Sequence, residues 1–417
     1  MSEVSNQQDP NLMDPWSVPL DQIDVSDPRL FQTDSHWGYF ERLRREDPVH
    51  LAESPLFGSY WSITRFDDIM QMEKNHEVFS SGQGITLQDR PADFTTPNFI
   101  SMDPPKHDVQ RKSVQGVVAP RNLAKMESLI RQRVESILDN LPIGERFNWV
   151  DRVSIELTTQ MLATLFDFPF EDRRKLTYWS DMATSSEAVG GTTPEAVRRA
   201  ALLECLEVMT ELRNERVGRD PAEATDLLSM LANNPDTADM EPMEFLGNLI
   251  LLIVGGNDTT RNSLSGGVLF LNQNPNEYDK LRADPGLIPS LVPEIIRYQT
   301  PLAYMRRTAK QDIDVGDKTI RAGDKIAMWY VSGNRDDTVI EQPDEFIIDR
   351  KNPRHHLAFG FGVHRCMGNR LAEMQLRVVW EEILQRFDRV EVVGEPVRVL
   401  SSFVRGYEEL PVVLHRR

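Results

Sequence analysis

The sequence predicts a mainly α-helical protein that folds as a single body with a few small β-sheets. Apolar residues recur every three or four positions over several long segments, whereas stretches rich in strand-forming residues are few and short. No repeat or low-complexity linker divides the 417 residues. Because residues 1–18 are polar and contain prolines, we expect a loosely ordered arm there and one domain over residues 19–417.

The longer predicted elements are helices. Helical periodicity marks residues 123–139, 153–166, 196–217 and 243–271, and a further helix is predicted from residue 369 onward. The fourth segment is bounded by Pro242 and Pro275 and carries Gly255 and Gly256 near its middle, where glycine weakens a helix. These two glycines therefore call for a local reason.

The predicted strands are short. They cover residues 59–63, 313–315, 325–329 and 390–393. Residues 334–361 show neither helical nor strand periodicity and are rich in Asp, Pro, Arg and His, so we expect an irregular coil. A coil of this length in a compact domain is usually functional or disordered.

Composition excludes some partners and compartments. The chain has 65 Asp and Glu against 47 Lys and Arg, a net charge of −18, which opposes binding to nucleic-acid phosphates. The N-terminus lacks the features of a signal peptide, and the most apolar stretch, residues 249–254, is far shorter than the roughly 20 residues of a spanning helix. We expect a cytoplasmic protein without membrane insertion.

Cys366 has the strongest chemical signal. It follows Gly360 and Gly362 and comes just before a predicted helix, where backbone amides and the helix dipole lower a thiol pKa and favour the thiolate. One alternative is an ordinary buried cysteine, the interpretation we favour for Cys205. Another is a nucleophile with His364 as its base, but no asparagine or aspartate that would orient this histidine is obvious. Two cysteines cannot form a four-cysteine zinc or iron–sulfur site.

The run Phe359-x-x-Gly362-x-His364-x-Cys366-x-Gly368 resembles the haem-binding loop of the cytochrome P-450 superfamily. Three further segments match this family in the right order. They are the propionate-binding helix at His107-x-x-x-Arg111, the oxygen-activation segment at residues 255–260 and the structural ion pair at Glu294-x-x-Arg297. The last motif is weak alone, since the same spacing recurs at Glu195 and Arg198. The similarity runs from about residue 20 to the C-terminus and indicates the branch of bacterial soluble alkane and fatty-acid terminal hydroxylases.

The resemblance implies haem b as cofactor and O2 as co-substrate, with the thiolate of Cys366 as the axial ligand of iron. It also implies haem contacts from Phe359, Gly255 and Gly360. Four residues are implied as partners of the two haem propionates: His107, Arg111, Arg307 and His364. The adjacent Arg306 leaves open which of the two arginines faces the haem.

The implied catalytic residues are Asp258 and Thr259. By resemblance, Thr259 holds a water beside the iron through its hydroxyl, and Asp258 relays protons into the pocket. An Asp–Thr pair inside an otherwise apolar helix is costly unless it has a role. Pro293 lies next to Glu294, so we expect that helix to begin near Pro289 or to kink there.

The implied reaction is terminal hydroxylation of medium-chain n-alkanes or fatty acids in a narrow apolar pocket, where each buried methylene is worth about 0.8 kcal/mol. We expect this pocket to be lined by Ile85, Leu87, Leu251, Val254, Leu302, Met305 and Phe403, although each residue also suits a plain core.

The electron source is expected to be external. No flavin or nicotinamide fingerprint follows a predicted strand, so we expect electrons to pass from NAD(P)H through a separate ferredoxin reductase and ferredoxin. A basic docking patch on the cysteine side would include Lys112, Arg365 and Arg370.

Two other functions stay open. One is hydroxylation of a terpenoid or another ring substrate, which spectral titration with linear and cyclic ligands would separate from the first. The other is a non-catalytic haem-thiolate gas sensor, which would not need Asp258 and Thr259.

Overall fold

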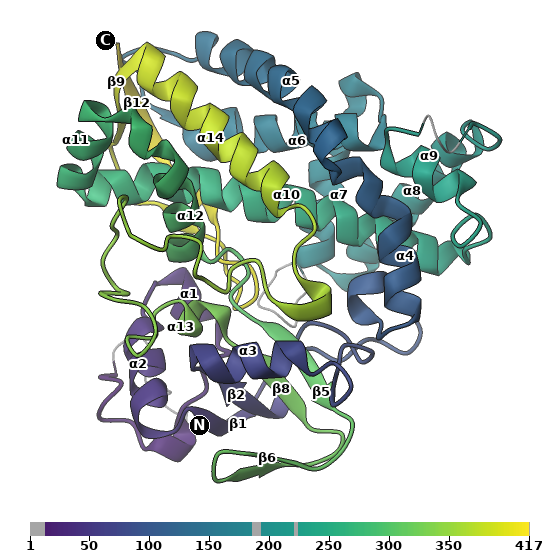
Figure 1. Cartoon of the computed structure of the whole chain (residues 1–417), viewed down its shortest axis with the longest axis vertical. Coiled ribbons are helices and arrows are strands. Elements are labelled where there is room, and N and C mark those ends of the chain that lie inside the picture. The colour runs from purple at the N-terminus through teal and green to yellow at the C-terminus, as the bar shows by residue number, and fades with distance from the viewer. Residues whose placement is uncertain (1–12, 186–192, 221–223, 417) are drawn as a thin grey trace, which may run out of the picture.

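The computed structural model describes residues 13–185, 193–220 and 224–416. Helices dominate and the sheets are small, which confirms the predicted fold class. Figure 1 shows the long helix α10 (Pro242–Gln273) crossing the middle of the molecule, with the N-terminal helices and the largest sheet at one end. The other helices are α1 (Pro28–Gln32), α2 (Trp37–Glu46), α3 (Phe66–Lys74), α4 (Lys106–Val114), α5 (Pro120–Asp139), α6 (Glu156–Phe166), α7 (Arg174–Thr184), α8 (Glu195–Asn214), α9 (Leu227–Asn233), α11 (Pro275–Ala283), α12 (Ile288–Gln299), α13 (Tyr330–Gly333) and α14 (Asn369–Arg386).

The largest sheet joins segments from both ends of the chain. Its order is β1-β2-β8-β5-β3, and the pair β2–β8 is parallel with Trp61 opposite Ile326, while the other pairs are antiparallel. Its strands are β1 (Val49–Ser54), β2 (Gly58–Ile63), β3 (Phe79–Ser80), β5 (Met305–Ala309) and β8 (Lys325–Met328). The smaller sheets contain β4 (Phe147–Asn148), β12 (Pro411–Arg416) and β9 (Phe387–Val392), then β6 (Ile313–Val315) with β7 (Lys318–Ile320), and β10 (Val397–Arg398) with β11 (Tyr407–Glu409).

The predicted helices are confirmed, with shifted ends. The segment 123–139 begins earlier, at Pro120, because proline suits the first turn of a helix. The segment 153–166 is α6 preceded by a π-helical stretch, Val150–Ile155. Each predicted strand overlaps an observed one, namely β2, β6, β8 and β9, and the other strands, including β1, β5 and β12, were not predicted. Residues 334–361 contain no helix or strand, as expected.

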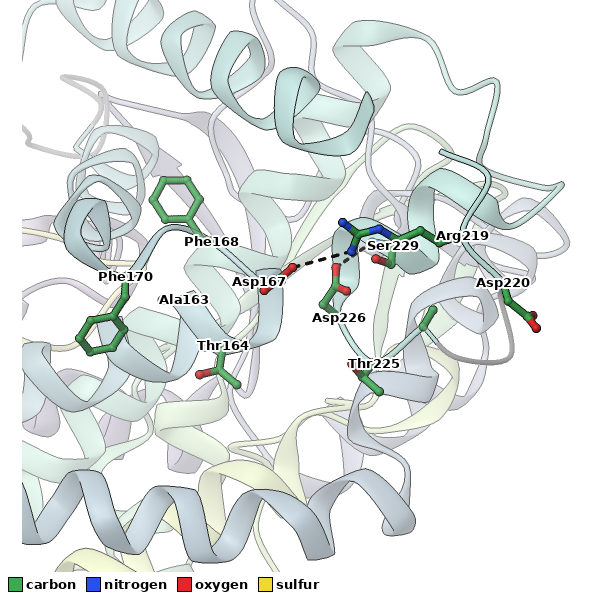
Figure 2. Close-up of a pocket in the computed structure, with 11 residues that line it drawn as sticks. Ala163, Thr164, Asp167, Phe168, Phe170, Arg219, Asp220, Thr225, Asp226 and Ser229 are labelled. Carbon is green, nitrogen blue, oxygen red and sulfur yellow. Dashed lines mark hydrogen bonds and ion pairs between the residues drawn. The ribbon is translucent and has the colours of Figure 1, made fainter. Parts of the chain in front are cut away.

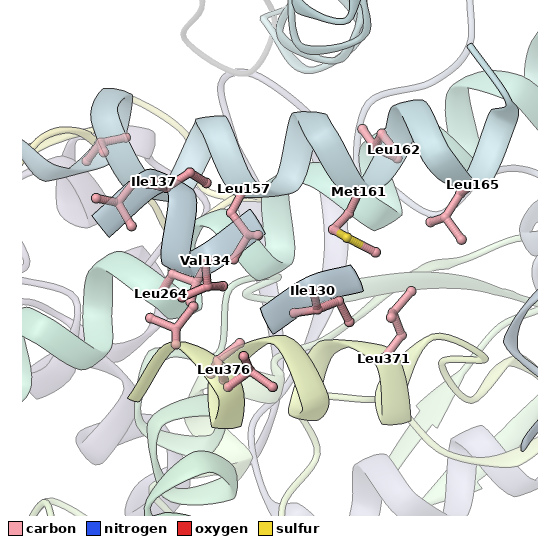
Figure 3. Close-up of a cluster of buried hydrophobic side chains, with 14 of the residues drawn as sticks. Ile130, Val134, Ile137, Leu157, Met161, Leu162, Leu165, Leu264, Leu371 and Leu376 are labelled. Carbon is pink, nitrogen blue, oxygen red and sulfur yellow. The ribbon is translucent and has the colours of Figure 1, made fainter. Parts of the chain in front are cut away.

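Apolar side chains from four helices meet in the main core. Figure 3 shows residues of α5, α6, α10 and α14 facing one another, among them Ile130, Met161, Leu264 and Leu376, all nearly inaccessible to solvent. Burying each such side chain contributes about 1.5–3 kcal/mol. This packing fixes the start of α14 relative to the middle of α10, the two segments that carry the main sequence motifs.

The helix α12 begins at Ile288 and continues through Pro293. The prediction of a start near Pro289 is therefore confirmed. Pro289 lies in the first turn, where backbone amides have no intrahelical acceptor, so a proline there costs no hydrogen bond. Pro293 does not disturb the next motif, because Arg297 reaches both carboxylate oxygens of Glu294 at 2.8 Å.

The predicted N-terminal arm lies partly outside the described residues, which begin at residue 13. Within its last part, Arg42 donates hydrogen bonds to the carbonyls of Pro15 and Val18, and Val18 is buried. That residues 19–417 form one domain stays a prediction. Across the described residues, no helix combines the length and the apolar character needed to cross a membrane.

Candidate active site

A cavity of about 350 Å³ lies between α10 and the loop that carries Cys366. It is lined by residues of both motifs, including Gly255, Thr259, Phe359 and Cys366. A second hollow of about 700 Å³ has charged and polar walls, with Asp167 close to Arg219 in Figure 2. No predicted site residue lines the second hollow, so the first cavity is the candidate site.

The cysteine loop is held by its own backbone and by α3. The amide of Cys366 donates to the carbonyl of Phe359 at 2.9 Å, and the amide of Arg365 donates to Gly362 at 3.2 Å. Gly362 has φ +66°, and a Cβ there would lie 2.1 Å from the carbonyl oxygen of Glu73. Only glycine fits this close approach, so the contact with α3 fixes the position of the cysteine loop.

Two opposing effects act on the Cys366 thiol. Burial raises its pKa, while the amides of Gly368 and Asn369 and the charge of Arg111 lower it, and burial is the larger effect. The prediction of a lowered thiol pKa is therefore wrong for the protein alone, although the predicted amides are in place. Burial also raises the pKa of Cys205, which lies inside α8 as an ordinary core residue.

The two adjacent arginines of β5 point in different directions. Arg307 lines the cavity and donates to the carboxylate of Glu73 at 2.7 Å. Arg306 instead donates to Asp89 at 2.8 Å and is not a lining residue. Alternation along a strand explains this, because neighbouring side chains point to opposite faces. Arg307 is therefore the arginine available to a ligand in the cavity.

Two histidines pack together at the same edge of the cavity. The ring centroids of His107 and His364 are 4.4 Å apart, and His364 lines the cavity while His107 packs behind it. One buried nitrogen of each ring, Nε2 of His107 and Nδ1 of His364, has no hydrogen-bond partner. Burial lowers the pKa of both, that of His364 to about 2. Arg111 completes this edge and donates to the carbonyl of Arg365 at 2.6 Å.

Thr259 and Gly255 form the opposite wall. The Thr259 hydroxyl donates to the Gly255 carbonyl at 2.9 Å, one turn earlier on α10. A Cβ at Gly255 would meet nothing within 4 Å, so the missing side chain leaves open space. A Cβ at Gly256 would lie 2.8 Å from Leu162, so that glycine permits close helix packing instead.

Asp258 points away from the cavity, toward α7. It is fully buried, and its Oδ1 accepts hydrogen bonds from Ser180 at 3.1 Å and from Asn257 at 3.1 Å, while its Oδ2 has no partner. Arg261 bridges Asp258 and Asp181 at 3.0 Å each. Burial raises the pKa of Asp258, and Arg261 opposes that rise. Because the Asp181 side chain is 46% exposed, this network runs from the helix interior to the surface.

Most of the expected pocket residues line the cavity. They are Ile85, Leu251, Val254, Leu302, Met305 and Phe403. Leu87 does not, and its prediction as a pocket residue is wrong. It is buried in the N-terminal core, and its amide donates to the Tyr304 hydroxyl, which turns this part of the loop away from the cavity.

Some residues at or near the site were not among the predicted site residues. Tyr330 lines the cavity and donates to Glu73, and neither residue was given a role from the sequence. Arg350, from the irregular coil, adds a third member to the Glu294–Arg297 pair at 3.1 Å. Their roles depend on contacts between remote segments, so only a three-dimensional arrangement reveals them.

The residues fit an iron porphyrin. A single cysteine faces the cavity, opposite the Thr259 wall, and three basic side chains, Arg111, Arg307 and His364, lie at the edge where two propionates would need partners. The orphaned histidine nitrogens fit the same anionic groups. Among the described residues, no group of three or more His, Cys, Asp or Glu side chains could hold a metal ion.

Comparisons with known proteins agree with this geometry. The family model "Cytochrome P450" matches residues 287–403. Linalool 8-monooxygenase of Pseudomonas putida is 33% identical over 407 residues, 95% of this chain and 99% of that protein. The methyl-branched lipid omega-hydroxylase of Mycobacterium tuberculosis H37Rv is 31% identical over 424 residues, 95% of this chain and 96% of that protein. The solved structure of cytochrome P450-153 from Novosphingobium aromaticivorans superposes with a TM-score of 0.88 at 43% identity, covering 97% of this chain and 100% of that one. The chain belongs to the cytochrome P450 family.

Proposed function

We propose that this monooxygenase uses haem b and O2 to hydroxylate the terminal carbon of medium-chain n-alkanes or fatty acids, with electrons from a ferredoxin. One observation carries the proposal: the cavity combines a single cysteine with a threonine-bearing helix and an aliphatic wall. When bound, haem with a thiolate ligand supplies an oxidant able to attack unactivated C–H bonds, which no side chain can do.

The roles proposed for the chain follow from these positions. Cys366 supplies the sulfur ligand, and Arg111, Arg307 and His364 hold the propionates. Thr259 keeps a hydroxyl beside the reacting centre, where it orders water. Asp258 delivers protons from the surface through its network with Arg261, which requires its carboxylate to turn toward the cavity. The Asp–Thr pair disfavours the gas-sensor alternative, because a sensor needs no proton delivery.

The lining supports an aliphatic substrate. Much of the cavity lining is aliphatic, including Leu251 and Val254 of α10 and Met305 of β5, and among the described residues the basic lining side chains are Arg111, Arg307 and His364. A hydrocarbon chain fits such a surface, since each buried methylene adds about 0.8 kcal/mol to binding. The similarity to a lipid omega-hydroxylase supports attack at a chain end.

A terpenoid is the second candidate substrate. The similarity to linalool 8-monooxygenase favours it, since linalool is an open-chain terpenoid that an apolar cavity also accepts. The two candidates differ in branching and in the hydroxyl group, so direct titration separates them.

Titration of the purified holoprotein tests the proposed substrate class. n-Octane, dodecanoic acid, linalool and camphor are compared for the shift of the Soret band toward high-spin iron. We expect linear chains to give the largest shifts and products hydroxylated at the terminal carbon, identified by gas chromatography with mass spectrometry. A shift with camphor or linalool alone, or subterminal products only, would contradict the proposal.

Ferredoxin docking is proposed at the basic residues around the cysteine loop. Lys112, Arg365 and Arg370 are exposed, and none of the three forms an ion pair with an acidic residue among those that the structure describes. Reversing two charges, with Lys112→Glu and Arg370→Glu together, should slow reduction by ferredoxin about tenfold at low salt and less at high salt. Arg321→Glu is the control. Arg321 directly follows β7, is exposed, and pairs with Asp312 rather than with any residue of the cysteine loop. Equal rates for both variants would exclude this docking patch.

A further inference from the structure

Glu73 is a buried carboxylate at the edge of the cavity. It lies near the end of α3, is 4% exposed, and belongs to none of the recognised motifs. Its Oε2 accepts from Arg307 at 2.7 Å, and its Oε1 accepts from the Tyr330 hydroxyl. Arg307 and Tyr330 both line the cavity. Glu73 therefore lies behind the cavity wall and contacts two of the residues that form it.

The position of Glu73 is fixed by the cysteine loop. Its carbonyl oxygen presses against Gly362, and a Cβ at Gly360 would lie 3.5 Å from its Oε1. The carboxylate itself is held by its hydrogen bonds from Arg307 and from the Tyr330 hydroxyl. Burying a carboxylate is costly, and the ion pair with Arg307 offsets that cost.

This placement changes the charge balance around the haem. Two arginines, Arg111 and Arg307, line the cavity, and the haem would bring two propionates to them. Glu73 adds a third carboxylate that shares Arg307. The bound site therefore holds one more carboxylate than arginine side chains, and the extra negative charge is screened little because it is buried.

We propose that Glu73 is a positioning residue that orients Arg307 toward the haem propionates and, through its charge, favours ferric over ferrous iron. Reduction adds one electron to the iron, and a nearby buried anion repels that electron. This inference goes beyond the hydroxylation proposed above and depends only on the binding of haem.

Potentiometric titration of the substrate-free holoprotein tests the charge effect. Glu73→Gln keeps both contacts, since the amide oxygen accepts from Arg307 and the amide nitrogen donates to Tyr330, but it removes the charge. We expect the equilibrium constant for reduction to rise about tenfold, a shift of about 59 mV for one electron. Glu77→Gln is the matched control, because Glu77 is exposed nearby and its removal should change the constant by less than about twofold.

Tyr330→Phe gives a second test with the opposite sign. It keeps the Glu73 charge but removes a hydrogen bond that disperses it, so the same equilibrium constant should fall. This variant reports on the charge even where Glu73→Gln does not take up haem. A rise or no change in Tyr330→Phe would overturn the proposal, as would equal shifts in Glu73→Gln and Glu77→Gln.

Haem transfer to apomyoglobin separates this role from a purely structural one. Removing the repulsion between Glu73 and the propionates should slow haem loss from Glu73→Gln or leave it unchanged. Faster loss without a shift in potential would show that Glu73 only supports the fold. None of these measurements uses a substrate, so their outcome is independent of whether alkanes or fatty acids are hydroxylated.

Discussion

Replacing Arg297 with alanine should destabilise the fold far more than the same change in another Glu-x-x-Arg pair. The Arg297 side chain is 1% exposed and donates to both oxygens of Glu294. It also donates to the carbonyls of Asn334, Pro343 and Glu345, at 2.8, 2.7 and 3.0 Å. It thereby ties α12 to the irregular coil that leads to the cysteine loop.

The magnitude follows from what the substitution leaves behind. Removing one partner of a buried ion pair costs about 3–5 kcal/mol, because the other charge stays buried. Arg350 still contacts Glu294 at 3.1 Å, so we expect the lower half of that range, about 3–4 kcal/mol. This is a large fraction of the 5–15 kcal/mol typical of folded domains.

The matched control is a pair with the same spacing in the first turn of α8, where the Arg198 side chain is 14% exposed. Arg198 pairs with Glu195 at 2.8 Å, but the Glu195 side chain is 39% exposed and also bonds to Arg199. Arg198→Ala should therefore cost well below 1 kcal/mol. Comparable losses of unfolding free energy in the two variants would refute the argument that burial, rather than spacing, makes the Glu294–Arg297 pair stabilising.

The assay is urea unfolding followed by tryptophan fluorescence, with haem retention measured on the same samples. The difference in midpoint at a common slope gives the change in the free energy of unfolding. Arg297→Lys serves where the alanine variant does not fold, since it keeps the charge but loses the forked contact with both oxygens. We expect its cost to lie between those of Arg297→Ala and Arg198→Ala.

Three further predictions concern the site and the response to acid. Cys366→Ser should abolish the thiolate-type absorption spectrum of the reduced carbon monoxide complex, and a retained thiolate-type spectrum would rule out Cys366 as the ligand. Thr259→Ala should keep haem and substrate binding but divert electrons to hydrogen peroxide, so product formed per NAD(P)H consumed should fall severalfold; unchanged coupling would contradict the role of the hydroxyl. Burial lowers the pKa of His36 to about 3, so the unfolded chain binds its proton first, and stability is lost as pH falls from about 6.5 toward 3, by up to about 1.4 kcal/mol per pH unit. His36→Gln should make the fall in urea midpoint between pH 7 and pH 5 shallower than in the wild type, and equal slopes would count against this assignment.

The local parts of the fold were predictable. Helices such as α5 and α10 follow from apolar spacing, because a 3.6-residue period is a property of one segment alone. The strand β5 was missed, since Met305–Ala309 contains two arginines that hide its strand character. Their partners, Glu73 and Asp89, lie more than two hundred residues earlier in the chain, so no local sequence pattern predicts these two contacts.

The amino-acid sequence by itself determined the helical class, the loop around Cys366 and the helix segment around Thr259, because spacing and residue type are local properties. Only the tertiary structure decided that Arg307 rather than Arg306 faces the cavity, that Leu87 leaves it, and that burial outweighs the backbone amides at the Cys366 thiol. Burial and charge pairing depend on which remote segments pack together, and that information appears only when the chain has folded.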